Sequence, residues 1–248
     1  MALLEVEGIR KQFGGLQAVA GASLTVAAGE IVGLIGPNGA GKTTLFNVIS
    51  RFVAPDAGTV RLAGESTARL RPHDVCQRGL ARTFQIARPF QGLTVLENVR
   101  IGALARRRGA AAATRARECV AFVGLEAKAT HPARGLTLAE RKRLELARAL
   151  ATEPRLLLLD EVMAGLNVTD TARIVELCRE INRGGITLLL IEHVMRAVMT
   201  LSHRIVVLNE GQVIAAGPPA AIARDPRVIE AYLGEAYVDA GEAPDAHA

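Results

Sequence analysis

The sequence has few aromatic residues and few cysteines. Only 3% of its 248 residues are aromatic and none is tryptophan, which argues weakly against the aromatic stacking surfaces that bind single-stranded nucleic acid. Cys76, Cys119 and Cys178 are scattered and form no CxxC pair or Cys/His cluster. This spacing argues against a disulfide framework or a zinc site and fits a reducing compartment.

Long apolar runs are also absent. The longest, Leu156–Leu159 and Ile186–Ile191, are far shorter than the roughly 20 residues that span a bilayer. The segment Met1–Arg10 includes Glu5 and Glu7, so it lacks the apolar core of a signal peptide and export is not expected. If the protein works at a membrane, other chains supply the spans.

The remaining composition is that of a globular protein. Half of the residues are hydrophobic, enough for one large domain or for one domain with an inserted lobe. The net charge of +5 and the isoelectric point of about 9.6 fit nucleic acid, an anionic ligand or the negative inner leaflet of a membrane. Charge alone does not choose among them.

Hydrophobic periodicity predicts strands that alternate with helices. Short strands around Leu3–Ile9 and Leu24–Val26, joined by a turn at Gly14 and Gly15, predict a small opening sheet. The further elements that we expect are a buried strand over 30–35, a helix over 42–50, a strand pair around 59–62, a basic helical lobe over 102–118, parallel strands over 155–159 and 186–191 flanking a helix, a helix with one buried face over 141–150, a hairpin over 204–215, a short helix after Pro218 and Pro219, and a disordered end over 239–248.

One motif predicts a nucleotide site. It has the form G-x-x-x-x-G-K-S/T between a buried strand and a helix, and it reads Gly36, Pro37, Asn38, Gly39, Ala40, Gly41, Lys42 and Thr43, followed by Thr44. Such glycines let backbone N–H groups converge on phosphate oxygens, while Lys42 reaches the β and γ phosphates and the Thr43 hydroxyl can bind Mg²⁺. A kinase or a GTPase would carry the same loop, so the loop alone leaves the class open.

An acidic pair favours hydrolysis over mere binding. Asp160 and Glu161 follow a buried strand, at the end of a sheet where such folds bind ligands. Asp160 suits Mg²⁺, and Glu161 is placed to polarise a water molecule as a general base. Glu192 and His193 repeat the arrangement one strand later, where the histidine can contact the γ phosphate or hold Glu161 and the water.

Taken in order with Thr83–Gln85 and Leu136–Glu140, these motifs resemble those of an ATPase subunit of an ABC transporter, over nearly all of the chain up to Gly234. The resemblance implies ATP and Mg²⁺ as cofactors. It implies an α/β fold, a P-loop NTPase (RecA-like) core with an N-terminal antiparallel β subdomain and an inserted helical subdomain. The corresponding division is 1–85 and 151–216 for the core with the β subdomain, 86–150 for the helical subdomain with the signature motif, and 217–248 for a C-terminal helix and tail.

Further residue roles come from the resemblance alone. It makes Gln85 the glutamine that contacts Mg²⁺ and water and senses the membrane partner, and His193 the switch histidine. It also places Phe13 where the family stacks an aromatic ring on adenine; a core aromatic beside a turn is the alternative. Thr137, Ala139 and Glu140 align with the signature L-S-G-G-Q/E, which caps the γ phosphate bound by the opposite subunit.

Three positions depart from the family pattern. Ala139 replaces a glycine, but its backbone N–H remains available at a helix start. Asn167 replaces an acid in the loop that, by the resemblance, communicates across the dimer. Val162 replaces a proline, a change that function should tolerate.

Additional segments resemble the subgroup that imports branched-chain amino acids: Arg82–Gln85, Leu93–Val99, Arg143–Arg148 and Val228–Gly234. The expected partners are integral membrane permease subunits, a second ABC ATPase subunit in a homo- or heterodimer and, indirectly, a periplasmic solute-binding protein, with no nucleic acid. The expected location is the cytoplasmic face of the inner membrane. Phe90, Leu93, Val95 and Leu96 could line a groove for a permease helix, although core packing is equally consistent with them.

Three other functions stay open at this point. The ATPase of a lipopolysaccharide exporter shares much of the same sequence. A soluble ABC ATPase that acts on nucleic acid would use the positive charge, with Arg106–Arg108 as its best contact, but such a run is more often a solvated helix face or a membrane-surface contact. A small-molecule kinase would need an acceptor pocket, which the sequence does not identify.

Overall fold

A six-stranded sheet forms the centre of the molecule. The computed structural model describes residues 2–85 and 89–232. The strand order is β10-β9-β3-β8-β7-β6, in which β10 alone is antiparallel to its neighbour. The strands are β3 (Ile31–Ile35), β6 (Leu80–Arg82), β7 (Leu156–Asp160), β8 (Thr187–Ile191), β9 (Arg204–Asn209) and β10 (Gln212–Gly217).

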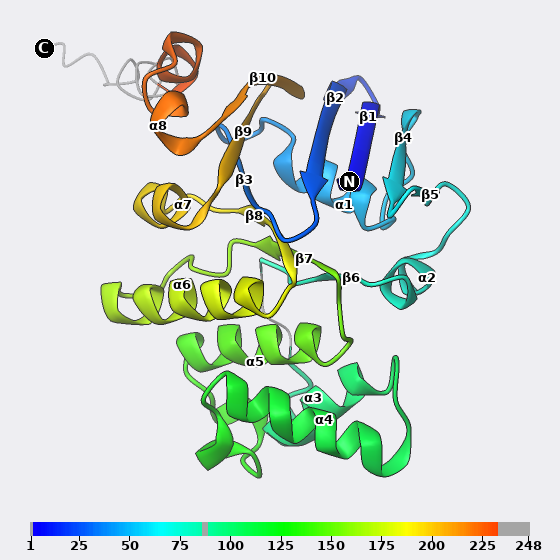
Figure 1. Cartoon of the computed structure of the whole chain (residues 1–248), viewed down its shortest axis with the longest axis vertical. Coiled ribbons are helices and arrows are strands. Elements are labelled where there is room, and N and C mark those ends of the chain that lie inside the picture. The colour runs from blue at the N-terminus through cyan, green and yellow to red at the C-terminus, as the bar shows by residue number, and fades with distance from the viewer. Residues whose placement is uncertain (1, 86–88, 233–248) are drawn as a thin grey trace, which may run out of the picture.

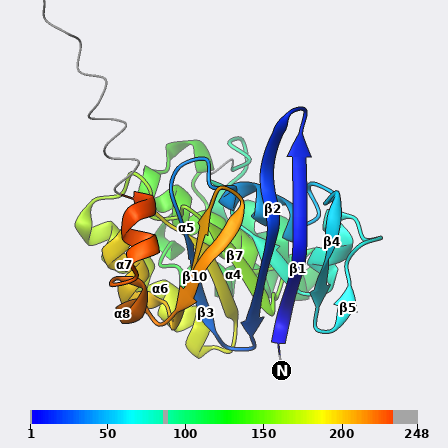
Figure 2. The same ribbon diagram turned by 90° about the horizontal axis from the view of Figure 1, so that it is seen from above.

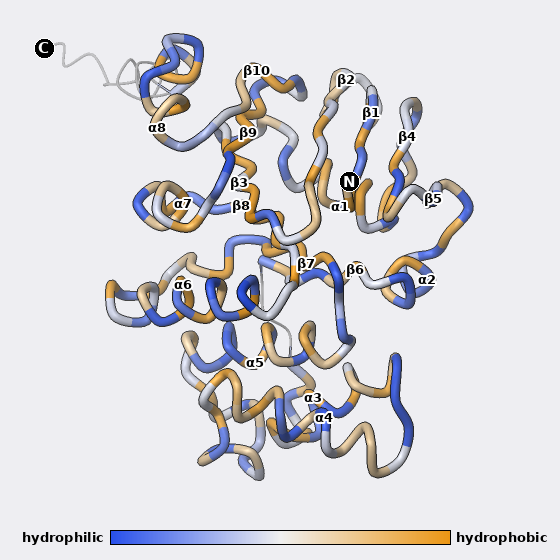
Figure 3. The backbone as a smooth tube through the Cα atoms, viewed as in Figure 1, coloured by the Kyte–Doolittle hydropathy of each residue, from blue (hydrophilic) through white to orange (hydrophobic). Residues whose placement is uncertain are grey.

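The central strands are buried on both faces. Every residue of β3, β7 and β8 is buried, and these strands are largely orange in the hydropathy colouring of Figure 3. Continuous apolar runs of this kind are typical of parallel strands that are covered by helices on both sides. The carboxyl ends of the three strands therefore meet at one edge of the sheet.

A second, antiparallel sheet lies beside the first. Its strands, in the order β2-β1-β4-β5, are β1 (Ala2–Phe13), β2 (Leu16–Ala27), β4 (Ala57–Leu62) and β5 (Glu65–Ser66). Figure 2 shows the long β1–β2 hairpin that the turn at Gly14 and Gly15 closes. Helix α1 (Lys42–Ile49) packs against β1 and β2, and its apolar side chains share one core with both sheets.

Helices cover the opposite face of the central sheet. Nearest to it lie α6 (Val168–Arg183) and α7 (Met195–Leu201), and α3, α4 and α5 form a lobe farther from the strands (Figure 1). The lobe helices are α3 (Val95–Ala103), α4 (Gly109–Phe122) and α5 (Leu138–Leu150), with two 3-10 turns over Glu126–Lys128 and Ala133–Gly135. The short helices are α2 (Pro72–Gln77) and α8 (Pro219–Ile222), and residues 226–232 are also helical. In the described part of the chain, no helix is both long and apolar enough to cross a membrane.

The fold class is confirmed, and each predicted strand is present, but β1 and β2 are 12 residues long instead of short and β6 was not predicted. The helix predictions need two corrections. The stretch 102–118 is not one helix, because α3 ends at Ala103 and α4 begins only at Gly109. Arg106–Arg108 therefore lie in the connection and not on a solvated helix face, and Arg107 forms an ion pair with Glu153.

The second correction concerns α5. The sequence predicts a helix with a single apolar buried face, yet the polar side chains of Lys142 and Glu145 are buried as well. The predicted disorder over 239–248 lies outside the described residues.

Candidate functional site

The loop between β3 and α1 is held in place by two neighbouring backbone segments. Gly36 and Gly41 have φ angles of 152° and 96°. A Cβ atom at Gly36 would lie 1.9 Å from the carbonyl oxygen of Leu208, and one at Gly41 would lie 2.2 Å from that of Ala18. Only glycine fits at these two points. The strands β9 and β2 thus fix the shape of the loop that the sequence assigns to phosphate.

The amino end of α1 is suited to an anion. Its N-cap is Gly41, which offers no side-chain hydrogen bond to the first turn, so the N–H groups of that turn remain available to phosphate oxygens. The buried ammonium group of Lys42 donates to the carbonyls of Gly36 and Pro37, at 2.7 Å each. Among the other loop residues, Asn38, Gly39 and Thr43 are exposed, Thr44 is half-buried and Ala40 is buried.

Glu161 follows β7 in an unusual backbone conformation. Its φ angle is +50°, in the left-handed region that residues other than glycine rarely adopt and that often marks a functional site. Its backbone N–H donates to the carbonyl of Ile191 at 2.9 Å. This bond ties the residue to the end of β8.

Two residues from distant parts of the chain hold the Glu161 carboxylate. Nε2 of Gln85 donates to Oε2 of Glu161 at 2.7 Å, and Nε2 of His193 lies 2.9 Å from Oε1. The Glu161 side chain is 13% exposed and that of His193 46% exposed. The structure therefore brings together three residues that the sequence singled out, with the carboxylate between an amide and an imidazole.

A buried lysine of the lobe joins the same cluster through the backbone. Nζ of Lys142, on α5, donates to the carbonyl of Gln85 at 2.9 Å and to that of Glu161 at 2.8 Å. Its residue is 2% exposed. Sequence reasoning missed this lysine because it lies among the other charged residues of a helix that was expected to bury apolar side chains.

The predicted metal ligands lie around one cavity. Thr43, Gln85 and Asp160 all line a hollow of about 820 Å³ between the core and the lobe. Asp160 is 1% exposed, and its Oδ2 accepts a hydrogen bond from Arg82 at 2.7 Å. Its Oδ1 is buried and lacks a hydrogen-bond partner in residues 2–85 and 89–232. An orphan carboxylate oxygen, a hydroxyl and an amide oxygen from residues that line one cavity are donors that Mg²⁺ accepts.

The same cavity has an apolar wall, which differs from the one suggested by the sequence. Phe52, Phe84 and Ile101 line it and are 54%, 43% and 40% exposed. The four side chains that the sequence suggested for a permease groove differ in their burial. Val95 is buried in the lobe core, Leu96 packs against that core, Leu93 is half-buried, and Phe90 is exposed with the Arg148 guanidinium over its ring. None of these four lines the cavity.

The signature segment forms the start of α5. Thr137 is the N-cap: its hydroxyl oxygen accepts from the N–H of Glu140, and the Glu140 carboxylate accepts from the N–H of Thr137. Ala139 is only half-buried. Within the described residues, no hydrogen bond or ion pair joins Thr137 or Glu140 to the phosphate loop. The segment is thus an ordered helix start whose capping bonds lie within the segment itself.

The structure also shows the surroundings of Phe13 and of two positions that depart from the family pattern. Phe13 ends β1 and is 48% exposed, so it is not a core aromatic; the ammonium of Lys11 lies 5.3 Å from its ring centroid. Asn167 is the N-cap of α6, where its side chain accepts from the N–H of Asp170 at 2.8 Å. An amide caps a helix as well as a carboxylate does, so α6 keeps its N-cap although Asn167 stands where the family has an acid. Val162 is buried.

Comparisons with known families agree with this arrangement. Residues 19–164 match the family model described as ABC transporter, and residues 212–238 match the one described as Branched-chain amino acid ATP-binding cassette transporter.

Several known proteins are similar over nearly the whole chain. The high-affinity branched-chain amino acid transport ATP-binding protein LivG of Salmonella typhimurium is 42% identical, over 94% of this chain and 98% of its own. The protein BraF of Pseudomonas aeruginosa, with the same description, is 41% identical over the same shares. The lipopolysaccharide export system ATP-binding protein LptB of Haemophilus influenzae is 34% identical, over 96% of this chain and 99% of its own.

Solved structures agree as well. The ADP conformation of MJ1267, an ATP-binding cassette of an ABC transporter, is 32% identical with a TM-score of 0.86, over 94% of this chain and 99% of its own. A dimeric post-hydrolysis state of the cassette MJ0796, bound to ADP and phosphate, is 26% identical with a TM-score of 0.79, over 87% of this chain and 98% of its own. The chain therefore belongs to the ABC transporter family, as one of its ATP-binding, ATP-hydrolysing subunits.

Proposed function

We propose that this chain is the ATPase subunit of an importer for branched-chain amino acids or related small solutes. The geometric observation that carries hydrolysis is the Glu161 carboxylate, held between Gln85 and His193 at the end of β7. The solute class rests on the similarity to LivG and BraF and on the match over residues 212–238.

The phosphate loop binds the substrate. The N–H groups of the first turn of α1 and of the glycine-rich loop meet the phosphate oxygens of ATP, and Lys42 meets the terminal phosphates. Its present bonds to the carbonyls of Gly36 and Pro37 hold the ammonium at the loop. Phe13, at the exposed tip of the β1–β2 hairpin, offers its ring to the adenine.

Glu161 acts on the water that attacks the γ phosphate. As a carboxylate it accepts a proton from that water and polarises it in line with the phosphate. Gln85 and His193 orient the carboxylate from two sides, because each holds a different oxygen. Both carboxylate oxygens of Glu161 have a partner, so one of them must release Gln85 or His193 before it can accept from the attacking water. We therefore assign to Gln85 and His193 the positioning of Glu161 and of that water.

Thr43, Gln85 and Asp160 are the residues that would hold Mg²⁺. The orphan Oδ1 of Asp160 and the shared cavity support this set. When bound, the ion supplies charge neutralisation at the phosphates.

We further propose that two ATPase subunits work as a pair. Thr137, Ala139 and Glu140 form a helix start with a hydroxyl group, and the amino end of a helix suits a γ phosphate held by another subunit. The dimeric state of the similar cassette MJ0796 supports pairing. The partner in the pair is a second copy or a sister ATPase.

The apolar wall of the cavity is the proposed docking site for the permease. Phe52, Phe84 and Ile101 offer exposed apolar surface there, and Gln85 lines the same hollow. A cytoplasmic helix of an integral membrane subunit that fills it would lie next to a residue bonded to Glu161. The proposal puts the chain at the cytoplasmic face of the cell membrane, with a periplasmic solute-binding protein acting through the permease.

The test is reconstitution in proteoliposomes. The chain would be combined with the branched-chain permease subunits, a sister ATPase and the binding protein, and ATP hydrolysis and uptake of labelled leucine would be measured together. We expect leucine to stimulate hydrolysis and uptake to require ATP. Leucine-independent hydrolysis without uptake, or stimulation only by the membrane subunits of a lipopolysaccharide exporter, would overturn the importer assignment.

Glu161→Gln provides the mechanistic arm. The variant should bind ATP, fail to hydrolyse it and accumulate as a closed dimer in size-exclusion chromatography. The exposed Glu180 of α6 supplies the matched control, since Glu180→Gln makes the same chemical change away from the cavity. Equal turnover in both variants would remove Glu161 from the mechanism.

A further inference from the structure

Arg82 is a buried cation that the proposed mechanism does not use. It ends β6, three positions before Gln85, and its side chain is 5% exposed. A guanidinium that is removed from water needs partners that hold it in place. Its partners are therefore informative about its role.

Polar contacts of Arg82 join two elements of the nucleotide site. One guanidinium nitrogen donates to Oδ2 of Asp160 at 2.7 Å, while another donates to Oδ1 of Asn47 at 2.7 Å and to the hydroxyl of Ser50 at 3.1 Å. Asn47 belongs to α1 and Ser50 is its C-cap. One side chain thus ties the helix of the phosphate loop to the carboxyl end of β7.

Aromatic rings surround the same guanidinium. Its Cζ lies 5.1 Å from the ring centroid of Phe84, 5.7 Å from that of Phe46 and 6.0 Å from that of Phe52, distances at which a cation is attracted to a ring. Phe52 and Phe84 also contact each other edge to face, at 5.5 Å and 87°. Because both rings line the cavity, Arg82 connects the cavity wall to Asp160.

The two oxygens of Asp160 are in different situations. Oδ2 is bonded to Arg82, whereas Oδ1 is buried and without a hydrogen-bond partner in the described residues. The backbone N–H of Asp160 is also fixed, by the hydroxyl of Thr83 at 3.1 Å. The residue is therefore held at Oδ2 and at its backbone N–H, with Oδ1 left for another ligand.

We propose that Arg82 is a positioning residue that holds Asp160 so that its Oδ1 meets the metal ion of the nucleotide, and that the rings of Phe52 and Phe84 set the position of Arg82 from the cavity side. The proposal rests on the assignment of Asp160 as a metal ligand in the proposed function. It makes the cavity wall and the metal site parts of one contact chain. A partner that moves Phe52 or Phe84 would then alter metal binding.

The experiment measures metal binding without turnover. All variants are made in the Glu161→Gln background, and no permease is present. The measured Mn²⁺ affinity therefore does not depend on whether the chain serves an importer of branched-chain amino acids. Mn²⁺ serves as the probe, and its affinity for the ATP complex is read by electron paramagnetic resonance. ATP binding in the presence of EDTA, followed with a fluorescent analogue, reports on the phosphate loop alone.

Arg82→Met is the main variant, and Arg78→Met is its control. Arg78 lies four positions earlier and forms an exposed ion pair with Glu65. We expect Arg82→Met to weaken Mn²⁺ binding by about tenfold or more, as is typical when a residue behind a metal ligand is removed. Binding of ATP in EDTA should change less than about twofold, because the charge-assisted contacts of the phosphate loop are left in place. Unchanged Mn²⁺ affinity in a folded Arg82→Met chain overturns the proposal.

Arg82→Lys covers the case in which the methionine variant does not fold. It keeps the buried positive charge but loses the fork that reaches Asp160 and α1 together, so Mn²⁺ binding should again weaken, and equal affinity would contradict the proposal. Phe52→Ala tests the cavity side. A weakened Mn²⁺ affinity in Phe52→Ala supports the link from the cavity wall to Arg82. An unchanged affinity overturns that link, while the Arg82 variants alone decide whether Arg82 positions Asp160.

Discussion

Nε2 of Gln85 donates a hydrogen bond of 2.7 Å to Oε2 of Glu161, across 76 positions of the sequence. Gln85 lines the cavity proposed for the permease, while Glu161 directly follows β7. Anything that displaces Gln85 must therefore break or stretch a bond to the proposed general base. We expect transport and hydrolysis to be coupled through this contact.

The first prediction compares the two residues that hold Glu161. Gln85→Ala and His193→Ala each free one carboxylate oxygen, so each should lower kcat by about 10²-fold with a smaller effect on KM, because a misplaced base loses its alignment with the water. Only Gln85→Ala should also lose the stimulation by permease. Steady-state ATPase assays with and without the membrane subunits check both statements, and equal stimulation in the two variants would contradict the coupling.

The second prediction concerns Lys42. Lys42→Ala removes a buried ammonium that bonds to two loop carbonyls and is assigned to the terminal phosphates. ATP affinity should fall by about ten- to a hundredfold, the range expected for the loss of a charge-assisted contact. Titration with a fluorescent ATP analogue measures this loss. AMP, which lacks the terminal phosphates, should bind both forms alike, and an equal loss for AMP would argue against the assigned contact.

The third prediction separates Lys142 from the general stability of α5. Lys142→Met fills a similar volume but leaves the carbonyls of Gln85 and Glu161 without their donor. We expect kcat to fall by about tenfold at nearly constant KM, as both residues lose a shared anchor. The free energy of unfolding should change by less than about 2 kcal/mol, since removal of a buried charge offsets the lost hydrogen bonds.

Arg141→Met, at the neighbouring position of the same helix, is the matched control for Lys142. Its activity should remain within about twofold of the wild type, because in the described residues the half-buried side chain of Arg141 has no hydrogen bond or ion pair to Gln85 or Glu161, and substitutions away from such contacts have small effects. Equal losses in the two variants would show that α5 as a whole had been disturbed and would remove the specific role of Lys142.

Local motifs predicted much of the site, because each carries its own physical requirement. The phosphate loop needs glycines wherever backbone carbonyls approach, as at Gly36 and Gly41, and this requirement is visible in the sequence. The end of β7 is equally visible, since an apolar run stops at two acids. The fold class followed from the same strands and from the resemblance that their motifs carry.

Contacts between distant segments could not be predicted in this way. Arg82 and Lys142 look like ordinary surface cations in the sequence, and only packing between segments that are distant in the sequence buries their side chains. Burial of this kind leaves no periodic mark in the sequence. The break near Arg108 has a different, local cause: Gly109, with a φ angle of 53°, begins a new helix, which helix propensity alone did not reveal.

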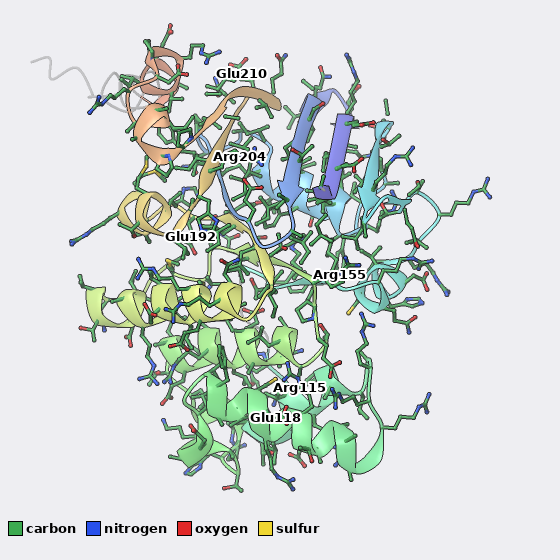
Figure 4. The ribbon with its side chains drawn as sticks, viewed as in Figure 1. Arg115, Glu118, Arg155, Glu192, Arg204 and Glu210 are labelled. Carbon is green, nitrogen blue, oxygen red and sulfur yellow. The ribbon has the colours of Figure 1, made fainter. Side chains whose placement is uncertain are left out.

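The last prediction follows from Glu192, which lies directly after β8 and is labelled in Figure 4. Its residue is 1% exposed, and burial raises its pKa to about 7, with the nearby Glu161 charge acting in the same direction and the N–H of Met163 opposing it. At pH values below the unfolded pKa of 4.5, both states hold the proton and folding carries no electrostatic penalty at this site. As the pH rises from there through 7, the unfolded chain ionises first, so the stability is progressively lost.

Glu192→Gln should remove that pH dependence while keeping an oxygen that accepts from the N–H of Met163 at 2.8 Å. The variant and the wild type should be similar in stability near pH 4.5, and the variant should become more stable by up to about 3 kcal/mol at pH 8, the value of the shift at 1.36 kcal/mol per unit. Urea unfolding at pH 5, 6, 7 and 8, without nucleotide or metal, measures the difference. Glu180→Gln on the exposed face of α6 should give a flat difference, and a flat difference for Glu192→Gln as well would mean that the folded protein ionises this carboxyl as readily as the unfolded chain does.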